Sequence, residues 1–304
     1  MSKCRGNMLT ILTPTYNRAY ILEKAYKSLL NQTNKNFEWM IVDDGSNDDT
    51  KDLVDKLISE GLIEIRYFYK QNGGKHTALN YGIKKLNTDY VLILDSDDCL
   101  EDDCVEKVLK EWEKYGENNK IGCLSFLRVL NGDRAIGKKY SEKEVVSNHI
   151  DFRYNRGLLG DMCEVFRVSV LKKFPFPVFG NEKFLSEAIV WNKIAYDYDT
   201  VYINYPVYVC EYLDDGLTTN SLRLRYNNPI GALENANMFL NSRFKLSIRV
   251  KNAILFDGFS LIAGKSLKSI FNNSNSKLLS VLFCPLGIVF YIWLNLMFKK
   301  KNSR

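Results

Sequence analysis

The chain has 304 residues, of which 46% are hydrophobic and 26% are charged, and its formal net charge is +6 at pH 7. This composition can bury a core and suits one large domain with an appendage. Seven scattered cysteines without a Cys-x-x-Cys pair exclude a disulfide framework and indicate reduced thiols in a cytosolic setting. No module of aromatic and basic residues accompanies the positive charge, so nucleic acid is excluded as the expected partner.

Polar residues follow the first two predicted strands. Residues 9–12 run into Thr13-Pro14-Thr15-Tyr16-Asn17-Arg18, and residues 39–42 run into Asp43-Asp44-Gly45-Ser46. A carboxylate at the end of the second strand can accept hydrogen bonds from a base N–H or a ribose hydroxyl, and Tyr16 offers a flat face for stacking. Each motif taken alone is equally typical of a turn.

A glycine-rich segment, Gln71-Asn72-Gly73-Gly74-Lys75-His76, follows the predicted strand 63–69 and opens a helix. Glycine allows close backbone approach, a helix N-terminus favours negative charge, and Lys75 adds a cation. We therefore expect this segment near a diphosphate, with a plain glycine-rich loop as the alternative. His76 is a weaker candidate for a cationic role because an imidazole is mostly neutral at pH 7.

The strand predicted over residues 90–94 is apolar at every position and runs into Asp95, Asp97 and Asp98. Such a strand is typical of the middle of a parallel sheet, and ligands collect at the carboxyl ends of these strands. Clustered carboxylates repel one another unless a cation holds them, and oxygen ligands suit Mg²⁺ or Mn²⁺ shared with substrate phosphates. The alternative is an acidic turn that caps the helix beginning near Glu101.

Strands and helices alternate to about Asp98, which predicts an α/β fold with a mostly parallel, doubly wound sheet. A helix over 101–115 and a strand over 121–127 follow, and residues 131–180 are less regular and suit an acceptor-side insertion. A helix near 182–196 and a strand at 200–203 complete the domain that we expect over residues 1–219. Its nucleotide-binding half is residues 1–98, and its acceptor half is residues 99–219.

Residues 220–304 differ in character. Residues 222–271 mix basic and apolar residues, and helices with basic residues on one face and apolar ones opposite suit a surface of lipid headgroups. Residues 278–298 are predominantly apolar and about long enough to cross a bilayer. A single span would carry Lys299-Lys300-Lys301 away from the cytosol, and Pro285 and Gly287 favour a kink. We therefore expect a re-entrant or interfacial hairpin. A buried core helix or a dimerisation helix is the alternative, so a homo-oligomer stays open.

Four motifs in order, at similar spacing, resemble those of family 2 glycosyltransferases of the GT-A fold. The resemblance covers roughly residues 8–215 and rests on Thr13-Pro14-Thr15-Tyr16-Asn17, Val42-Asp43-Asp44-Gly45-Ser46, Asn72-Gly73-Gly74-Lys75 with Asn80-Tyr81-Gly82-Ile83, and Asp95-Ser96-Asp97-Asp98. It implies that Thr13, Tyr16, Asp43 and Asp44 contact the nucleoside, that Asp95 lies near the ribose and donor sugar, and that Asp97 holds Mn²⁺ or Mg²⁺. The share of Asp98 in metal binding stays open.

The resemblance also implies a catalytic base. Family members carry Glu-Asp with a tryptophan four residues beyond the aspartate, and this chain reads Ser186-Glu187 before Trp191. Glu187 is therefore the candidate base that takes the acceptor proton. Asp161 stands where relatives shape the acceptor pocket, so we expect it to contact acceptor or donor sugar hydroxyls; the alternative is that it caps a turn. Residues 211–218 are a candidate lid, or a simple Asp-Gly turn.

These expectations combine into one function. We expect an inverting, metal-dependent transfer of one sugar from a nucleotide donor, taken to be a UDP-sugar, to a polyprenyl-diphosphate-linked glycan in bacterial surface polysaccharide assembly. The Gln-x-x-Arg-Trp motif of processive synthases is absent, since the only glutamines are Gln32 and Gln71. No signal peptide opens the chain, so we expect attachment to the cytoplasmic face of the membrane. The alternatives are a sugar nucleotidyltransferase and a non-catalytic nucleotide-sugar-binding subunit.

Overall fold

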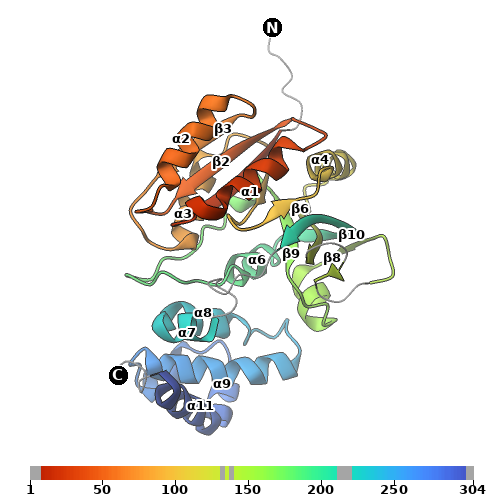
Figure 1. The fold of residues 1–304 in the computed structure, drawn as a ribbon. Helices are drawn as coiled ribbons and strands as arrows, with labels where there is room; N and C mark the ends of the chain where they lie inside the picture. Colours follow the sequence, from red (N-terminus) through yellow and green to blue (C-terminus); the bar gives the residue numbers. More distant parts are fainter. Residues whose placement is uncertain (1–7, 131–133, 137–139, 211–220, 299–304) are drawn as a thin grey trace. The chain divides into compact units, whose positions relative to one another are not determined.

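The structure is a computed structural model and describes residues 8–130, 134–136, 140–210 and 221–298. Contacts within the chain divide it into two compact units, and Figure 1 shows their ribbons. Unit 1 comprises Met1–His149, Leu158–Phe176 and Lys193–Tyr212. Unit 2 comprises Ile150–Gly157, Pro177–Asn192 and Leu213–Arg304.

Unit 1 is built on one mixed sheet. Its main path has the order β3-β2-β1-β4-β9-β6-β10-β5, while β7 pairs with β6 and β8 with β10. The strands are β1 (Leu9–Thr15), β2 (Phe37–Asp43), β3 (Ile65–Tyr69), β4 (Tyr90–Ile93), β5 (Cys99–Leu100), β6 (Ile121–Leu130), β7 (Arg134–Ala135), β8 (Glu144–Ser147), β9 (Met162–Arg167) and β10 (Asp199–Cys210).

The first four strands of the path run parallel, as the alternation of strands and helices predicts. The next strand, β9, is antiparallel to both of its neighbours, β4 and β6. The sequence analysis left this strand inside an irregular insertion, and it expected only residues 200–203 of the longer β10. The sheet is therefore mostly parallel in its first half and mixed in its second.

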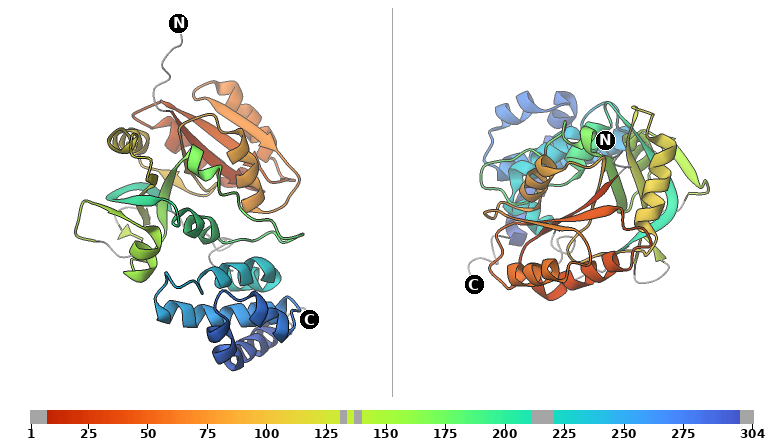
Figure 2. Two further views of the ribbon diagram at one scale, coloured as in Figure 1. Left: turned by 180° about the vertical axis from the view of Figure 1, so that it is seen from behind. Right: turned by 90° about the horizontal axis from the view of Figure 1, so that it is seen from above.

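Helices cover both faces of this sheet, as the views in Figure 2 show. Those of unit 1 are α1 (Ala19–Leu30), α2 (Thr50–Glu60), α3 (Lys75–Lys85), α4 (Cys104–Tyr115) and the short α5 (Val168–Leu171). On one face, Leu22 and Leu29 of α1 join Leu9 and Ile11 of β1 in the main core. On the other face, α3 comes so near that a Cβ on Gly82 would lie 2.6 Å from Leu12 Cδ1.

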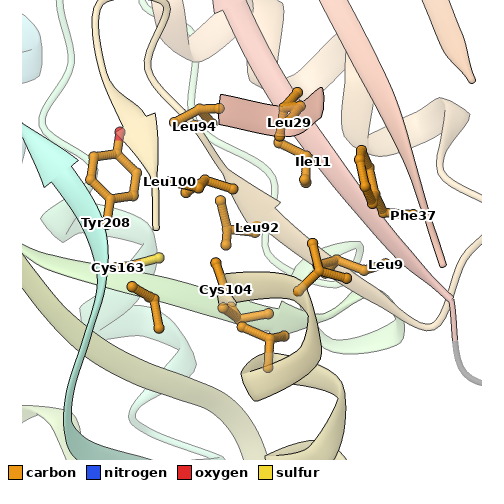
Figure 3. Packing of buried hydrophobic residues seen from close by; sticks show 14 of the residues in the cluster. Leu9, Ile11, Leu29, Phe37, Leu92, Leu94, Leu100, Cys104, Cys163 and Tyr208 are labelled. Atoms are coloured by element: carbon orange, nitrogen blue, oxygen red, sulfur yellow. The ribbon is translucent and has the colours of Figure 1, made fainter. Parts of the chain in front are cut away.

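The core of unit 1 explains why the strands form where they do. Every residue of β1, β2 and β4 is buried, which suits strands covered on both faces. Leu92 of β4 lies among Leu9, Leu100 and Cys104 (Figure 3). At the edge of this core, Trp112 of α4 stacks on Tyr90 with ring centroids 4.3 Å apart.

Unit 2 is helical. Its helices are α7 (Ser221–Asn227), α8 (Pro229–Met238), α9 (Leu246–Ile262), α10 (Leu267–Asn273) and α11 (Lys277–Phe298), together with a π-helical turn at Ile150–Asn155 and the first residues of α6 (Ala188–Ile194). Its core joins α8, α9, α10 and α11 through side chains such as Leu233, Phe256, Ile270 and Leu294. The helix expected to begin near residue 182 begins at Ala188.

The hairpin expected within residues 278–298 does not form. These residues lie in one continuous helix, α11, with Pro285 inside it. Residues on both sides of the proline, including Ser280 before it and Leu294 after it, are buried in the core of unit 2. This packing holds the helix together although proline removes one backbone hydrogen bond.

Candidate functional site

The carboxyl ends of β1, β2 and β4 meet at one edge of the sheet, as the sequence predicts. The three strands are neighbours and run parallel, and Thr15 pairs with Asp43 in the register of β1 and β2. The pairing continues past the strands, because Asp44 N donates to Thr15 O at 2.8 Å and Leu94 N donates to Leu12 O at 3.0 Å. The structure thus brings the first, second and fourth motifs together.

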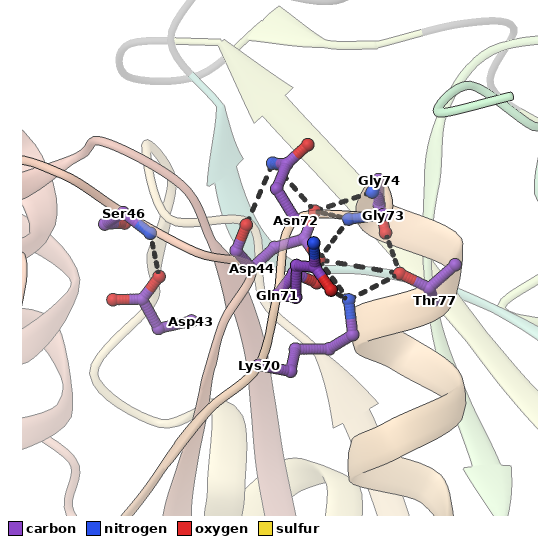
Figure 4. A network of polar contacts seen from close by, with 9 residues as sticks. All are labelled: Asp43, Asp44, Ser46, Lys70, Gln71, Asn72, Gly73, Gly74 and Thr77. Atoms are coloured by element: carbon purple, nitrogen blue, oxygen red, sulfur yellow. Dashed lines mark hydrogen bonds and ion pairs between the residues drawn. The ribbon is translucent and has the colours of Figure 1, made fainter. Parts of the chain in front are cut away.

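Asp44 is the centre of a buried polar network at this edge (Figure 4). Its carboxylate accepts hydrogen bonds from the backbone N–H groups of Gly73, at 3.0 Å, and Gly74, at 2.6 Å. Lys70 Nζ lies 2.5 Å from the same carboxylate, and Asn72 donates its side-chain amide at 3.2 Å. Asp44 therefore holds the glycine-rich segment in place ahead of α3.

Glycine is required at one point of this network. A Cβ on Gly45, whose φ is +86°, would lie 2.7 Å from the backbone nitrogen of Asn72. Gly74, at φ 91°, also has a left-handed backbone and stands directly before α3. The second and third motifs are therefore parts of one hydrogen-bonded turn system, which the sequence analysis treated as two separate loops.

Asp43 is buried beside this network and has both oxygens engaged. One accepts from Ser46 N at 2.7 Å, and the other accepts from the Tyr67 hydroxyl at 2.7 Å. Burial, and then the hydrogen bond to Asp43, raise the pKa of Tyr67, so this hydroxyl keeps its proton and donates. The contact of Asp43 with a nucleoside stays a prediction.

Thr13 and Tyr16 have different surroundings. The Thr13 hydroxyl is fully buried and accepts a hydrogen bond from the Trp39 indole at 2.9 Å. Tyr16 is 45% exposed, so its ring is open for stacking. Between the two loops, Ser46 accepts from Asn17 N at 2.8 Å, and Asn17 adopts a positive φ of 52°.

In the acidic motif after β4, the negative charge of one carboxylate, Asp95, is balanced by nearby cations. Lys75 Nζ, from the start of α3, lies 2.5 Å from Asp95, and Arg128 Nη1 lies 3.9 Å from it. Burial acts to raise the pKa of Asp95, but the charges of Lys75 and Arg128 outweigh it and lower that pKa. The predicted cation Lys75 therefore stands at the acidic motif itself.

Asp97 and Asp98 are less compensated. Burial, and then Asp95, raise the pKa of Asp97; burial, Asp95 and Asp97 raise the pKa of Asp98 to about 6. Asp98 accepts a hydrogen bond from Tyr208 at 2.9 Å. Asp97 is half-buried, and in the described part of the chain its carboxylate makes no hydrogen bond or ion pair with another residue. It is the freer of the two carboxylates.

Two residues that the sequence analysis missed complete this cluster. Tyr208 of β10 is fully buried, and its hydroxyl bridges the backbone N–H of Asp95, at 2.9 Å, and the Asp98 carboxylate. The Arg128 guanidinium of β6 lies 4.1 Å from the centroid of the Tyr208 ring and 3.9 Å from Asp98. An arginine within a buried strand was the available signal, because arginine is rarely buried without a partner.

Asp161 lies at the same edge of unit 1. It is exposed and precedes Met162, the first residue of β9, which pairs with Leu127 near the end of β6. Arg128 Nε donates to the Met162 carbonyl at 2.8 Å, which ties the start of β9 to the acidic cluster. A role of Asp161 in binding sugar hydroxyls stays a prediction.

Three further candidates from the sequence remain. Glu187 belongs to unit 2 and directly precedes α6, where its carbonyl accepts from Val190 N at 2.9 Å and from Trp191 N at 3.2 Å. Its assignment as the base stays a prediction. The candidate lid, residues 211–218, lies outside the described residues. His76 is buried, and burial lowers its pKa, which agrees with a neutral imidazole.

Comparisons with known proteins give relatives of one kind. Residues 10–172 match the model described as glycosyl transferase family 2. The chain is 29% identical over 238 residues to the GalNAc(5)-diNAcBac-PP-undecaprenol beta-1,3-glucosyltransferase of Campylobacter jejuni, covering 77% of this chain and 74% of that protein. It is 43% identical over 113 residues to an uncharacterized glycosyltransferase of Rickettsia conorii, but spans only 18% of that relative.

Solved structures give the same fold. S. aureus TarS 1-349 in complex with UDP-GlcNAc has a TM-score of 0.63 at 16% identity, covering 97% of this chain and 92% of that one. The mannosyltransferase PcManGT from Pyrobaculum calidifontis, in complex with GDP-Man and Mn2+, has a TM-score of 0.57 at 15% identity, covering 95% of this chain and 83% of that one. These likenesses confirm the expected GT-A fold. Because the family model matches more than half of its residues, this chain belongs to glycosyl transferase family 2.

Proposed function

We propose that the protein is an inverting, metal-dependent glycosyltransferase that moves one sugar from a UDP-sugar to a lipid-linked glycan. The observation that carries the proposal is the charge arrangement at the carboxyl edge of the sheet. There, Lys75 compensates Asp95, while Asp97 and Asp98 keep raised pKa values. An edge of this kind, beside a glycine-rich helix start, suits a sugar nucleotide with its metal.

The donor nucleotide would occupy the ends of β1 and β2. Tyr16 would stack on the base, and the buried carboxylates of Asp43 and Asp44 would orient the base and ribose, directly or through the loops that they hold. UDP is the favoured nucleotide because the TarS structures contain UDP or UDP-GlcNAc. Lys75 would face the diphosphate. Its ion pair with Asp95 already holds the Lys75 side chain at the acidic motif.

The acidic motif fits a divalent cation. The pKa values of Asp97 and Asp98 are raised by burial and by neighbouring carboxylates, and a dication would relieve this repulsion. Asp97 is the favoured ligand because Asp98 is bound to Tyr208. The described residues hold no group of three or more metal-ligating side chains, so the diphosphate would supply further oxygens, as is usual for Mg²⁺. When bound, Mn²⁺ or Mg²⁺ would neutralise charge on the leaving diphosphate.

Inversion requires a base on the acceptor side. Glu187 would take the proton of the acceptor hydroxyl while the oxygen attacks the anomeric carbon opposite the leaving diphosphate. The Glu187 carboxylate would keep that proton, so the acceptor oxygen would be neutral in the new glycosidic bond. Asp161 would contact sugar hydroxyls from the start of β9.

We propose a lipid-linked acceptor at the cytoplasmic face of a membrane, in bacterial surface polysaccharide assembly. One relative is named for an undecaprenyl-diphosphate-linked acceptor, and another, from Staphylococcus aureus, for poly(ribitol-phosphate). Residues 221–298 carry nine basic side chains and two acidic ones, which favours an anionic surface. The described residues also include a helix, Lys277–Phe298, that is long and apolar enough to cross a membrane.

A second function is favoured by one observation. Ser186 stands where the family pattern has an acidic residue, so the chain could bind a nucleotide sugar as a silent partner subunit. The rate of sugar transfer by the native protein, compared with that of Glu187→Gln, would separate the two functions. A binding subunit would transfer no sugar in either form.

Calorimetric titration of UDP, with Mn²⁺ and then with chelator, tests the donor site. We expect metal-dependent binding that Asp97→Asn abolishes while the fold stays intact. Asp49→Asn is the matched control, because Asp49 is exposed at the start of α2 and its side chain makes no capping bond. Tight Mn²⁺-dependent binding of UDP by Asp97→Asn would refute the metal assignment.

A further inference from the structure

Helix α11 has two unlike faces. Its buried face includes Leu279, Gly287 and Leu294, which belong to unit 2's interior. The opposite face is apolar and exposed, at spacings of three and four residues, and Leu282, for example, is 64% exposed. Its members include Val281, Leu282, Leu286, Val289, Trp293 and Leu296. An apolar stripe that runs along the exposed side of a helix in this way marks an interaction surface.

The buried face of α11 is closely fitted to α9, which lies beside it (Figure 1). A Cβ on Gly258 of α9 would lie 2.5 Å from the Phe290 ring, and a Cβ on Gly287 would lie 2.6 Å from Asp257 Cβ. Ser280 of α11 donates a hydrogen bond to the buried Asp257 carboxylate of α9. These contacts leave no room between the two backbones, so α9 and α11 behave as one pair.

This pairing conflicts with a transmembrane orientation. At about 1.5 Å per residue, α11 is ~33 Å long, enough to cross a bilayer. The helix would then carry α9 with it, including Arg249, Lys251 and Asp257, or lose its packed face to lipid. Charged side chains are costly within hydrocarbon, and the Ser280 to Asp257 hydrogen bond would be placed there too.

An orientation in the plane of the membrane removes this conflict. An interfacial helix normally turns a polar face to water, and here α9 covers the inner face instead. The exposed apolar stripe can then enter the boundary between headgroups and acyl chains. Trp293 suits this boundary because tryptophan is enriched there. Three exposed lysines accompany these helices: Lys265 lies between α9 and α10, Lys268 belongs to α10, and Lys277 is the first residue of α11.

We propose that the exposed stripe of α11 inserts into one leaflet of an anionic bilayer, with α11 parallel to the surface and α9 on its aqueous side. The excess of basic over acidic residues in 221–298 selects a lipid surface as the occupant over a second copy of this chain, which would repel it. The inference deepens the proposed function, since a lipid-linked acceptor is reached from such a surface. It does not depend on donor binding, so the two can fail separately.

Vesicle sedimentation tests the stripe. Full-length protein is mixed with phosphatidylcholine vesicles that contain or lack phosphatidylglycerol, and the bound fraction is measured. We expect binding that needs phosphatidylglycerol and that falls at least about tenfold in the double variant Leu282→Asp with Val289→Asp. Leu62→Asp is the control, because Leu62 is a leucine that is 62% exposed and belongs to unit 1, whereas α11 belongs to unit 2. An unchanged circular dichroism spectrum and an unchanged melting temperature show that each variant is folded.

Depth of insertion tests the orientation. Tryptophan is placed by Leu282→Trp or Val289→Trp in a Trp293→Phe background, and quenching by lipids brominated at shallow or deep acyl positions is compared with that in the native protein. The other three tryptophans, Trp39, Trp112 and Trp191, are buried, and their signal is measured in Trp293→Phe alone and subtracted. We expect shallow quenching of similar strength at all three positions. Deep quenching at residue 289 with shallower quenching at either end would establish a span and overturn the proposal.

Two further results would also overturn it. If the double variant binds vesicles as well as the native protein does, the stripe does not contact the membrane. A protein that ignores vesicles and is dimeric until the double variant makes it monomeric would show that a second copy covers the stripe. In either case, metal-dependent UDP binding would still decide the proposed function independently.

Discussion

The Tyr208 hydroxyl donates a hydrogen bond to Asp98 across a distance of 2.9 Å, although the two residues lie 110 positions apart in the sequence. The same hydroxyl accepts from the Asp95 backbone N–H at 2.9 Å. One buried tyrosine on β10 thus fixes both ends of the Asp95-to-Asp98 turn. The geometry of the proposed metal site therefore depends on a strand from the far half of unit 1.

Tyr208→Phe should loosen this turn without emptying space in the core. It removes one hydrogen bond to a carboxylate and one to the backbone, each worth about 1–3 kcal/mol. We expect the Kd for UDP with Mn²⁺ to rise at least about tenfold, measured by calorimetry. Tyr205→Phe is the control on the same strand, because Tyr205 bonds to Asp103 instead. Equal Kd values for both variants would show that Tyr208 does not position the motif.

Asp44→Asn should destabilise unit 1. The new amide would place a donor against the N–H groups of Gly73 and Gly74 and leave Lys70 without its anion. Loss of such a buried, charged hydrogen-bond acceptor costs about 2–4 kcal/mol. Denaturant unfolding checks this, with Asp49→Asn as a surface control. A change below about 0.5 kcal/mol would mean that the loop is held by other contacts.

Glu187→Gln should separate binding from transfer. If Glu187 is the base, the amide cannot accept the acceptor proton, and the transfer rate should fall by about 10²–10⁴-fold. UDP affinity should stay within a factor of about two, because the change is nearly isosteric and the proposed contacts with UDP come from other residues. Single-turnover transfer of radiolabelled sugar measures the first quantity, and calorimetry measures the second. A near-native transfer rate would remove Glu187 from the mechanism.

Asp257 should make the stability of unit 2 depend on pH. Burial raises its pKa to about 6 in the folded state, although its hydrogen bond from Ser280 acts to lower it. The carboxyl group has a pKa near the usual value of about 3.9 in the unfolded state. Between about pH 3.9 and pH 6, the folded state therefore holds a proton that the unfolded state has lost. Its destabilising effect is absent at pH well below about 3.9 and complete once the pH passes about 6.

Asp257→Asn tests this linkage. The amide can still accept the Ser280 hydrogen bond but has no charge to bury. We expect a gain of about 3 kcal/mol in unfolding free energy at pH 8 and about half of that at pH 5. Thermal or denaturant unfolding across this range measures the difference. If the variant and the native protein show parallel pH curves, Asp257 carries no buried charge.

Local sequence patterns predicted the first half of unit 1 well. The strands that became β1, β2, β3 and β4 are apolar runs that end in turn-forming polar residues, and both features are visible within a short window. Parallel pairing then places their ends at one edge, so the meeting of Tyr16, Asp44 and Asp95 followed from the order of the motifs. The position of Lys75 at the start of a helix was also predicted, but its ion pair with Asp95 was not.

The second half of unit 1 was predicted less well. β9 runs antiparallel between β4 and β6, and residues 162–167 alone do not show which neighbours they will have. Arg128 and Tyr208 lie beyond the strands expected over 121–127 and 200–203, and their partner, Asp98, is remote from both in the sequence. Lys70 was also missed, since its ion pair with Asp44 joins two separate loops.

The sequence by itself determined the α/β class, the family and the set of motifs, because apolar period, turn residues and motif order are local properties of the chain. Only the tertiary structure decided which carboxylates are compensated, since that depends on cations and hydroxyls from other strands. It also decided that α11 is continuous and paired with α9, because close backbone packing at Gly258 and Gly287 outweighs the local tendency of Pro285 to break a helix.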